Sequence, residues 1–285
     1  MDHHTAAAEG ALSFWKMNGS GNDFILLDNR TGTFPDTGRG ILVRRLCHRQ
    51  TGIGADGLIL IENDGELDFR WQFHNADGSL AEMCGNGGRC AARFAFLNRI
   101  AGPVMVFGTL AGPIRAVMDG DRVKLQLTAP VGLEKDIRLE LDGASLRGGF
   151  VNTGVPHVAV EVDDLDAFPV VDTGRRIRYH ECFRPAGTNA NFYQVVDAET
   201  VRIRTYERGV EDETLACGTG SVAVALIAAG LGKVTSPTRV VTRSGEVLGV
   251  FHRRDGAGFA EVFLEGDAKI VYKGTVFKEF FDAAG

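Results

Sequence analysis

The chain has 285 residues, of which 44% are hydrophobic and 24% charged, a composition typical of a folded protein of one or two domains. The net charge of -6 and the lack of a basic run give no support for nucleic-acid binding. The longest apolar stretch, SVAVALIAAGLG, falls short of the roughly 20 residues that span a bilayer. The first dozen residues lack a basic start and an apolar centre, so we expect a mobile extension and not a signal peptide. We therefore expect a cytoplasmic protein without membrane or nucleic-acid partners.

Strands are expected to outnumber helices. Alternating, β-branched and aromatic segments predict strands at 24–29, 57–62, 68–75, 104–109, 114–127 (a hairpin turning at Asp119-Gly120), 157–162, 191–197, 201–207, 238–244, 247–253 and 260–266. Helices are predicted at 37–49, 85–100 and 218–232. The apolar residues of the last two spread around the whole helix, which indicates buried helices. The sum is a mixed α/β or α+β fold and not a regular βαβ alternation.

The two halves of the chain resemble each other. In each, a strand leads to a cysteine and a glycine turn, CGNG at 84–87 or CGTG at 217–220, followed by a helix and a hairpin. Upstream, GSGNDF at 19–24 has a rough counterpart in AGTNANF at 186–192. We predict two pseudo-symmetric domains, each a strand-rich layer or barrel wrapped around a central helix, with the active site in the cleft between them. Residues 1–129 with 266–285 would form the first domain, and residues 130–265 the second.

Glycine patterns also suggest nucleotide binding, but their context argues against it. GIGADG at 52–57 follows a helix and precedes a strand, the reverse of a dinucleotide fingerprint. GTGSVA at 218–223 opens a helix, yet about ten residues separate it from the strand upstream, where that fold needs a tight turn. A zinc site at His74, Cys84 and Cys90 lacks a fourth ligand at suitable spacing. We expect neither a cofactor nor a metal.

The five cysteines should be reduced in the cytoplasm, where catalysis is a more frequent role than a disulfide framework. Cys47, Cys90 and Cys182 are interpreted as packing residues. Cys84 and Cys217 each precede a helix, whose dipole and free N–H groups lower a thiol pKa and bind carboxylates. Two such thiols on opposite faces of an α-carbon suit a racemase or epimerase, in which one thiolate removes the proton and the other thiol returns one.

The motifs MNGSGNDF, HNADGSLAEMCGNGGRC, VNTGVPH, GTNANF and YERGVEDETLACGTG resemble the diaminopimelate epimerase family, in the same order and over residues 16–277. The resemblance implies two pseudo-symmetric α/β domains, a homodimer, and cofactor-independent interconversion of LL- and meso-diaminopimelate in lysine and peptidoglycan synthesis. It implies that Cys84 acts on the LL isomer and Cys217 on the meso isomer, and that His157 and Glu207 tune the two thiols. The substrate contacts it implies are Asn22, Asn75, Gly85, Asn86, Asn189, Glu207, Arg208, Gly218 and Thr219.

Two positions depart from the family pattern. Val155 stands where many members have asparagine, and Gly57 where some have glutamine. These departures keep open a second hypothesis, a racemase of another amino acid that uses the same thiol pair. A third hypothesis is a redox sensor whose two cysteines form a reversible disulfide.

Overall fold

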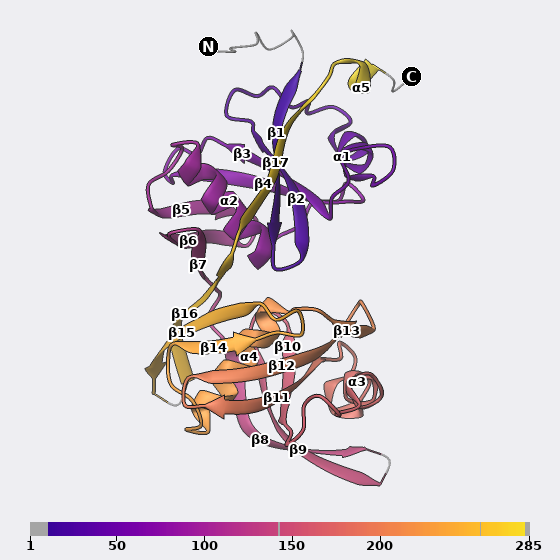
Figure 1. Cartoon of the computed structure of the whole chain (residues 1–285), viewed down its shortest axis with the longest axis vertical. Coiled ribbons are helices and arrows are strands. Elements are labelled where there is room, and N and C mark those ends of the chain that lie inside the picture. The colour runs from indigo at the N-terminus through magenta and orange to yellow at the C-terminus, as the bar shows by residue number, and fades with distance from the viewer. Residues whose placement is uncertain (1–10, 142, 257, 283–285) are drawn as a thin grey trace. The chain divides into compact units, whose positions relative to one another are not determined.

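The computed structural model describes residues 11–141, 143–256 and 258–282. The chain divides into two compact units (Figure 1), one ending at Val123 and resuming at Asp267, the other formed by Lys124–Gly266. Most of the expected N-terminal extension lies outside the described residues. No helix in the described part of the chain is both long and apolar enough to cross a membrane.

The first unit is a sheet with one helix on each face of its parallel core. Its elements are β1 (Leu12–Gly19), β2 (Asn22–Asp28), α1 (Arg39–Cys47), β3 (Gly57–Glu62), β4 (Phe69–Asn75), α2 (Gly85–Leu97), β5 (Val104–Thr109), β6 (Gly112–Asp119), the start of β7 (Arg122–Gln126), β17 (Lys269–Val276) and α5 (Glu279–Asp282). Strands β2 and β3 are parallel and almost fully buried. Alternate side chains of the two strands, such as Ile25 and Leu58, pack into one cluster with Val43 of α1. The intervening side chains point to the opposite face, where α2 contacts both strands.

The second unit repeats this arrangement. Its elements are β8 (Val131–Leu141), β9 (Ala144–Asn152), β10 (Pro156–Glu161), α3 (Val170–Arg178), a short 3₁₀ helix (Glu181–Phe183), β11 (Asn189–Asp197), β12 (Thr200–Glu207), β13 (Asp212–Thr214), α4 (Gly218–Gly230), β14 (Thr238–Val241), β15 (Val247–Asp255) and β16 (Gly258–Asp267). The parallel pair β10–β11 lies between α3 on one face and α4 on the other.

Strand pairing shows the repeat directly. In the first unit β2–β3 is parallel, β3–β4 antiparallel, β4–β5 parallel and β5–β6 antiparallel. In the second, β10–β11, β11–β12, β12–β14 and β14–β15 follow the same series. Helices α2 and α4 therefore occupy equivalent places, and the predicted pseudo-symmetric mixed α/β fold is confirmed.

The helix that follows each cysteine is the core of its unit. Ten residues of α4, from Gly220 to Ala229, are buried, and so are eight residues of α2. This confirms the prediction of two buried helices. The expected strand at 238–244 is shorter, and β1, β8, β9 and α3 were not predicted from the sequence.

One sequence-level correspondence is wrong. The turn GSGNDF joins β1 to β2, and its topological equivalent is the β9–β10 turn around Gly154, not AGTNANF. The two turns share a glycine with positive φ, 92° at Gly21 and 111° at Gly154. AGTNANF enters β11 and therefore corresponds to the entry to β3 at Gly57. The two segments have similar sequences because each leads into a buried strand, β2 in one case and β11 in the other.

Candidate active site

Each of the two candidate catalytic cysteines is the N-cap of its central helix. Cys84 and Cys217 have extended backbone angles, with φ of -146° and -131°. The sulfur of Cys84 accepts a hydrogen bond from the Gly87 N–H at 3.4 Å, and that of Cys217 accepts one from Gly220 at 3.4 Å. The sulfur thus replaces the oxygen of a usual capping side chain. Both thiols are held at the positive end of a helix dipole.

The glycine that follows each cysteine by three residues packs closely on the strand beneath it, most tightly at Gly220. A Cβ on Gly220 would lie 2.4 Å from Oδ1 of Asn191, and one on Gly87 would lie 3.2 Å from Cδ1 of Ile59. The first turn of each helix therefore rests directly on the strand beneath it. This contact explains the CGxG spacing that the sequence repeats.

The helix N–H groups act on both thiol pKa values in the expected direction, but burial outweighs them and the net pKa of each thiol is raised. Burial raises the pKa of Cys217 to about 11, and the nearby Glu207 carboxylate raises it further. The Thr219 hydroxyl and the N–H groups of Gly220 and Thr219 act in the opposite direction but do not outweigh burial. Burial likewise raises the pKa of the Cys84 thiol against the N–H groups of Gly87 and Asn86. Desolvation of the thiolate therefore exceeds the effect of these hydrogen bonds.

In the first unit, the predicted contacts Asn22 and Asn86 are joined. The Asn86 amide donates to Oδ1 of Asn22 at 2.7 Å, and the Asn22 amide donates to Asp56 at 3.0 Å. Arg89 donates to Oδ1 of Asn86 at 2.8 Å, and Arg49 pairs with Asp56 at 2.7 Å. The Asn86 side chain, at the start of α2, is thus held by a chain of polar contacts that runs from the Arg89 guanidinium at one end to the Arg49 guanidinium at the other.

This chain continues into a cluster of charged side chains, in which Lys16 is buried and Arg49 is 61% exposed. Asp23 pairs with Lys16 at 2.7 Å and with Arg49 at 2.8 Å. Burial disfavours the Asp23 carboxylate, but hydrogen bonds from Arg49 and Lys16 outweigh it and lower its pKa. Sequence reasoning missed Lys16, Arg49 and Asp56. The sequence did contain a signal for Asp56. It is a polar residue immediately before the buried strand β3, just as Asn22 precedes the buried part of the parallel strand β2.

Asn75 ends β4 opposite Gly57 of β3. Its amide donates to Oγ of Ser79 at 3.0 Å, within the turn that follows the strand. A Cβ on Gly57 would lie 2.6 Å from both the His74 carbonyl oxygen and the ring of Phe73. A glutamine would therefore not fit at position 57 without movement of this strand.

In the second unit, five predicted residues form one network: Cys217, Thr219, His157, Asn189 and Arg208. Nε2 of His157 lies 3.0 Å from Oγ1 of Thr219, which lies 3.6 Å from the sulfur of Cys217. The Asn189 amide lies 3.5 Å from Nε2, and its oxygen accepts from the Arg208 N–H at 2.7 Å. Thr153 donates to the Thr219 carbonyl at 3.0 Å and ties the helix start to the β9–β10 turn.

The ionisable groups of this network are shifted by burial. Burial, reinforced by the charge of Arg208, lowers the pKa of His157 to about 3, so the ring is neutral near pH 7. Burial raises the pKa of Glu207. Gly85 and Gly218 occupy the first helical position after each cysteine, where their N–H groups have no partner within the helix.

The strand registers relate the two sites residue by residue. Phe24 faces Gly57 across β2–β3, as His157 faces Asn189 across β10–β11. Gly57 thus corresponds to Asn189, and Asn75, one strand further, to Glu207. The departures Val155 and Gly57 each correspond to an asparagine in the other unit, Asn22 and Asn189. Each unit therefore presents one asparagine from this pair of positions.

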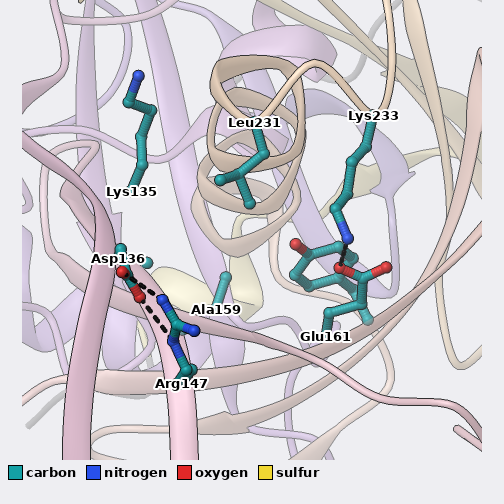
Figure 2. Close-up of a pocket in the computed structure, with 10 residues that line it drawn as sticks. Lys135, Asp136, Arg147, Ala159, Glu161, Leu231 and Lys233 are labelled. Atoms are coloured by element: carbon teal, nitrogen blue, oxygen red, sulfur yellow. Dashed lines mark hydrogen bonds and ion pairs between the residues drawn. The ribbon is translucent and has the colours of Figure 1, made fainter.

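A cavity of about 430 Å³ in the second unit lies away from these residues. Figure 2 shows its ion pairs, Arg147 with Asp136 and Lys233 with Glu161. Leu231 and Lys233 of its lining follow the C-terminal end of α4, and Cys217 caps the other end of this 13-residue helix. At 1.5 Å per residue the two ends are about 20 Å apart, so the cavity is not part of the thiol site.

Among the described residues, no group of three or more histidine, cysteine, aspartate or glutamate side chains is arranged to hold a metal ion. All five cysteines are free thiols.

The fold, with its two repeated α/β units, is also found in proteins whose structures have been solved. Over 94% of this chain and 99% of the other, the structure resembles a PhzF-family phenazine biosynthesis protein from Bacillus anthracis, with a TM-score of 0.66 at 16% sequence identity. That level of identity shows a common fold and no more.

Sequence comparison defines the family within this class. The diaminopimelate epimerase model matches residues 14–131 and 149–271. The chain is 48% identical to a diaminopimelate epimerase of Aquifex aeolicus over 282 residues, covering 95% of this chain and all of that one. It is 42% identical to one from Archaeoglobus fulgidus, covering 93% and 96%. The chain belongs to the diaminopimelate epimerase family, and the protein is an isomerase.

Proposed function

We propose that the protein interconverts LL- and meso-diaminopimelate with Cys84 and Cys217 as the two acid–base catalysts and with no cofactor. The observation that carries the proposal is the repeated capping geometry, in which a free thiol and a set of helix N–H groups occupy equivalent places in two units of one topology. Family membership supplies the substrate, an amino acid with two reactive ends.

The reaction needs one proton out and one proton in. For the LL isomer, the Cys84 thiolate takes the α-proton, and the electron pair left on carbon delocalises into the carboxylate. The Cys217 thiol then delivers its proton to the opposite face, which leaves Cys84 as a thiol and Cys217 as a thiolate. The meso isomer restores the starting state by the reverse steps.

The helix N-termini are suited to the reacting carboxylate. The N–H groups of Gly85, Asn86, Gly218 and Thr219 stabilise the charge that grows on the carboxylate as the α-proton leaves. The raised thiol pKa values suit the proton donor of the pair, because such a thiol is protonated near pH 7. The burial of Cys217, which raises its pKa, also strengthens hydrogen bonds to the carboxylate on that side.

Polar side chains around each helix start are proposed to hold the rest of the substrate. Asn22, Asn75 and Asn189 offer amide donors and acceptors, Arg208 a bidentate partner for a carboxylate, and Glu207 a partner for an ammonium group. His157 and Glu207 would tune Cys217, since one lies a single hydroxyl away from its sulfur and the other raises its pKa.

The decisive assay incubates the purified protein with LL-diaminopimelate in deuterated water, without added cofactor. We expect meso-diaminopimelate that carries one deuterium at the inverted carbon. A panel of other amino acids is run in parallel. Exchange confined to another amino acid would reject diaminopimelate as substrate, and no exchange with any substrate would reject the two-thiol reaction.

We also propose a homodimer that acts in the cytoplasm, where reducing conditions keep the thiols free. Strand β17 carries three consecutive exposed apolar residues, Ile270, Val271 and Tyr272, of which Val271 is 57% exposed. Such an exposed apolar run is typical of a protein interface. Sedimentation velocity should give a dimer for the parent chain and a monomer for Val271→Asp, whereas a monomeric parent would reject the dimer.

A further inference from the structure

Behind Cys217 lies a buried residue to which the chemistry above gives no role. Asn191 is fully buried on β11, two residues after Asn189 and on the same face of the strand. Its Nδ2 lies 3.1 Å from Nδ1 of His157 and donates to the Val158 carbonyl at 2.7 Å. Its Oδ1 accepts from the Thr205 hydroxyl at 3.0 Å.

These partners leave one orientation for the Asn191 amide. The Val158 carbonyl can only accept, so the atom 2.7 Å from it must be the NH₂ group. Rotating the amide by 180° would bring two oxygens to that distance in a site without solvent. The NH₂ group therefore also faces Nδ1 of His157, and Nδ1 must accept.

The state of Nδ1 decides the rest of the ring. A neutral imidazole carries one proton, so a ring that accepts at Nδ1 carries its proton on Nε2. Nε2–H then donates to Oγ1 of Thr219 at 3.0 Å, and the Thr219 hydroxyl hydrogen remains available for the Cys217 sulfur. The Asn189 NH₂ group also faces Nε2, but its 3.5 Å contact is longer than the 3.0 Å contact with Thr219 and the 3.1 Å contact of Asn191 with Nδ1, so the two shorter contacts set the tautomer.

We propose that Asn191 is a positioning residue that fixes His157 as the Nε2–H tautomer, so that hydrogen bonds run in one direction from Asn191 through His157 and Thr219 to the sulfur of Cys217. The chain stabilises the Cys217 thiolate without placing a charge behind it. It also leaves the Asn189 amide hydrogens for a substrate. The inference deepens the proposed function, on which its catalytic consequence rests, but the tautomer itself requires no substrate.

The primary test is nitrogen-15 NMR of the histidine side chains, with the His157 signals assigned by their loss in His157→Gln. We expect a one-bond N–H coupling at Nε2 and an unprotonated Nδ1. In Asn191→Asp, a carboxylate of the same shape faces Nδ1, and we expect a proton there. A parent protein with its proton on Nδ1 would overturn the proposal even if no variant folds, and so would an Asn191→Asp variant whose Nδ1 stays unprotonated.

Thr205→Val is the matched control. It removes a hydroxyl from the same buried network, yet the Val158 carbonyl still orients Asn191, so the Nε2–H tautomer should persist. If Thr205→Val instead moved the proton to Nδ1, loosening of the network and not the Asn191 amide would govern the tautomer, and the proposal would fail.

The last step of the chain is tested by alkylation of the thiols. Iodoacetamide labelling of Cys217 is measured by peptide mass spectrometry relative to Cys84, which serves as an internal standard. We expect the ratio to fall severalfold in Thr219→Val, to recover in Thr219→Ser, and to change less than twofold in Thr205→Val. An unchanged ratio in Thr219→Val would show that the hydroxyl does not reach the sulfur. Because neither readout uses a substrate, a wrong tautomer would leave the epimerase proposal standing, and a wrong substrate would leave the tautomer standing.

Discussion

The two helix caps have the same backbone and opposite surroundings. Beneath Cys217 the strands supply His157, Asn191 and Thr205, a buried polar network with partners for its amide and ring nitrogens. The registers place Phe24, Ile59 and Phe73 at the equivalent positions beneath Cys84. There the aromatic rings of Phe24 and Phe73 meet edge to face at 5.9 Å. One thiol is backed by hydrogen bonds and the other by hydrocarbon.

The first unit places its polar residues elsewhere. Its chain of Arg89, Asn86, Asn22 and Asp56 runs past the start of α2 and not beneath it. Thr219 stands where Asn86 would be, and its hydroxyl is engaged from below by His157. The two units therefore hold the side chain at the second helical position in different ways. Asn86 is held by the charged Arg89, and Thr219 by the neutral His157 ring. Pseudo-symmetry of the backbone therefore does not make the two thiols chemically equivalent.

Removing either thiol should have the strongest consequence. Cys84→Ser and Cys217→Ser should each lower the rate of epimerisation by about 10³-fold or more, because serine is far too weak an acid–base group for this step. Circular dichroism and thermal unfolding should remain close to the parent, since serine is also a good helix N-cap. Cys90→Ser, at a fully buried cysteine in α2, the helix that Cys84 caps, is the control and should affect stability more than rate. Full activity in either catalytic variant would contradict the assignment of that cysteine.

A buried amide should not be tolerated beneath Cys84. Ile59→Asn places in the first unit the residue that the second unit has at the equivalent position, but without the partners of Asn191. The unpaired amide and the lost apolar contacts should lower the free energy of unfolding by about 3 kcal/mol. Ile59→Val, which removes only a methylene, should cost about 1 kcal/mol. Urea denaturation measures both, and equal losses would show that this site already holds polar partners.

The charged chain of the first unit should matter for substrate binding. Asp56→Ala removes the acceptor of the Asn22 amide and a partner of Arg49. We expect kcat/KM for the LL isomer to fall about tenfold, mainly through KM, because Asn22 is no longer held in place. Asp36→Ala, at an aspartate whose side chain is 94% exposed, should leave kcat/KM unchanged. A parent-like KM in Asp56→Ala would exclude the chain from substrate positioning.

Much of this architecture could be predicted from the sequence. Strands 57–62 and 104–109 were predicted to the residue, the first from a fully buried apolar run and the second from β-branched and aromatic residues with alternating burial. The two CGxG turns predicted both helix starts, since the spacing itself records the contact of a helix with a strand. Strand β8 was missed because most of its residues are exposed and its pattern is not that of a core strand.

The site was predictable only where a motif carried it. Asn189 and His157 were found by family resemblance, but Asn191 was not, although it lies two residues after Asn189 and shares its face. Asp56 and Arg49 were missed because their proposed role is to hold Asn22 in place. Asn22 is distant from both in the sequence and meets Asp56 only through a tertiary contact. Thiol pKa values could not be predicted, because burial opposes the helix dipole and its extent is known only once the strands are placed.

A weaker effect is expected in the free energy of unfolding at acid pH, through the buried His157 ring. The folded protein keeps His157 neutral down to about pH 3, whereas a histidine in the unfolded chain takes up a proton near pH 6.5. Below pH 6.5 the unfolded state therefore binds more protons, and stability falls as the pH falls. From pH 6 to pH 5 this histidine should account for a loss of about 1 kcal/mol.

Burial also lowers the pKa of His74 and His252, so the overall slope of stability against pH includes other groups. The parent must therefore be compared with His157→Gln. That variant lacks the network and starts from a lower stability, but its free energy of unfolding should decline less steeply between pH 6 and pH 5 in urea titrations. Parallel curves for the two proteins would mean that His157 takes up its proton over the same pH range in the folded and unfolded states, which would contradict the neutral ring behind Cys217 between pH 5 and pH 6.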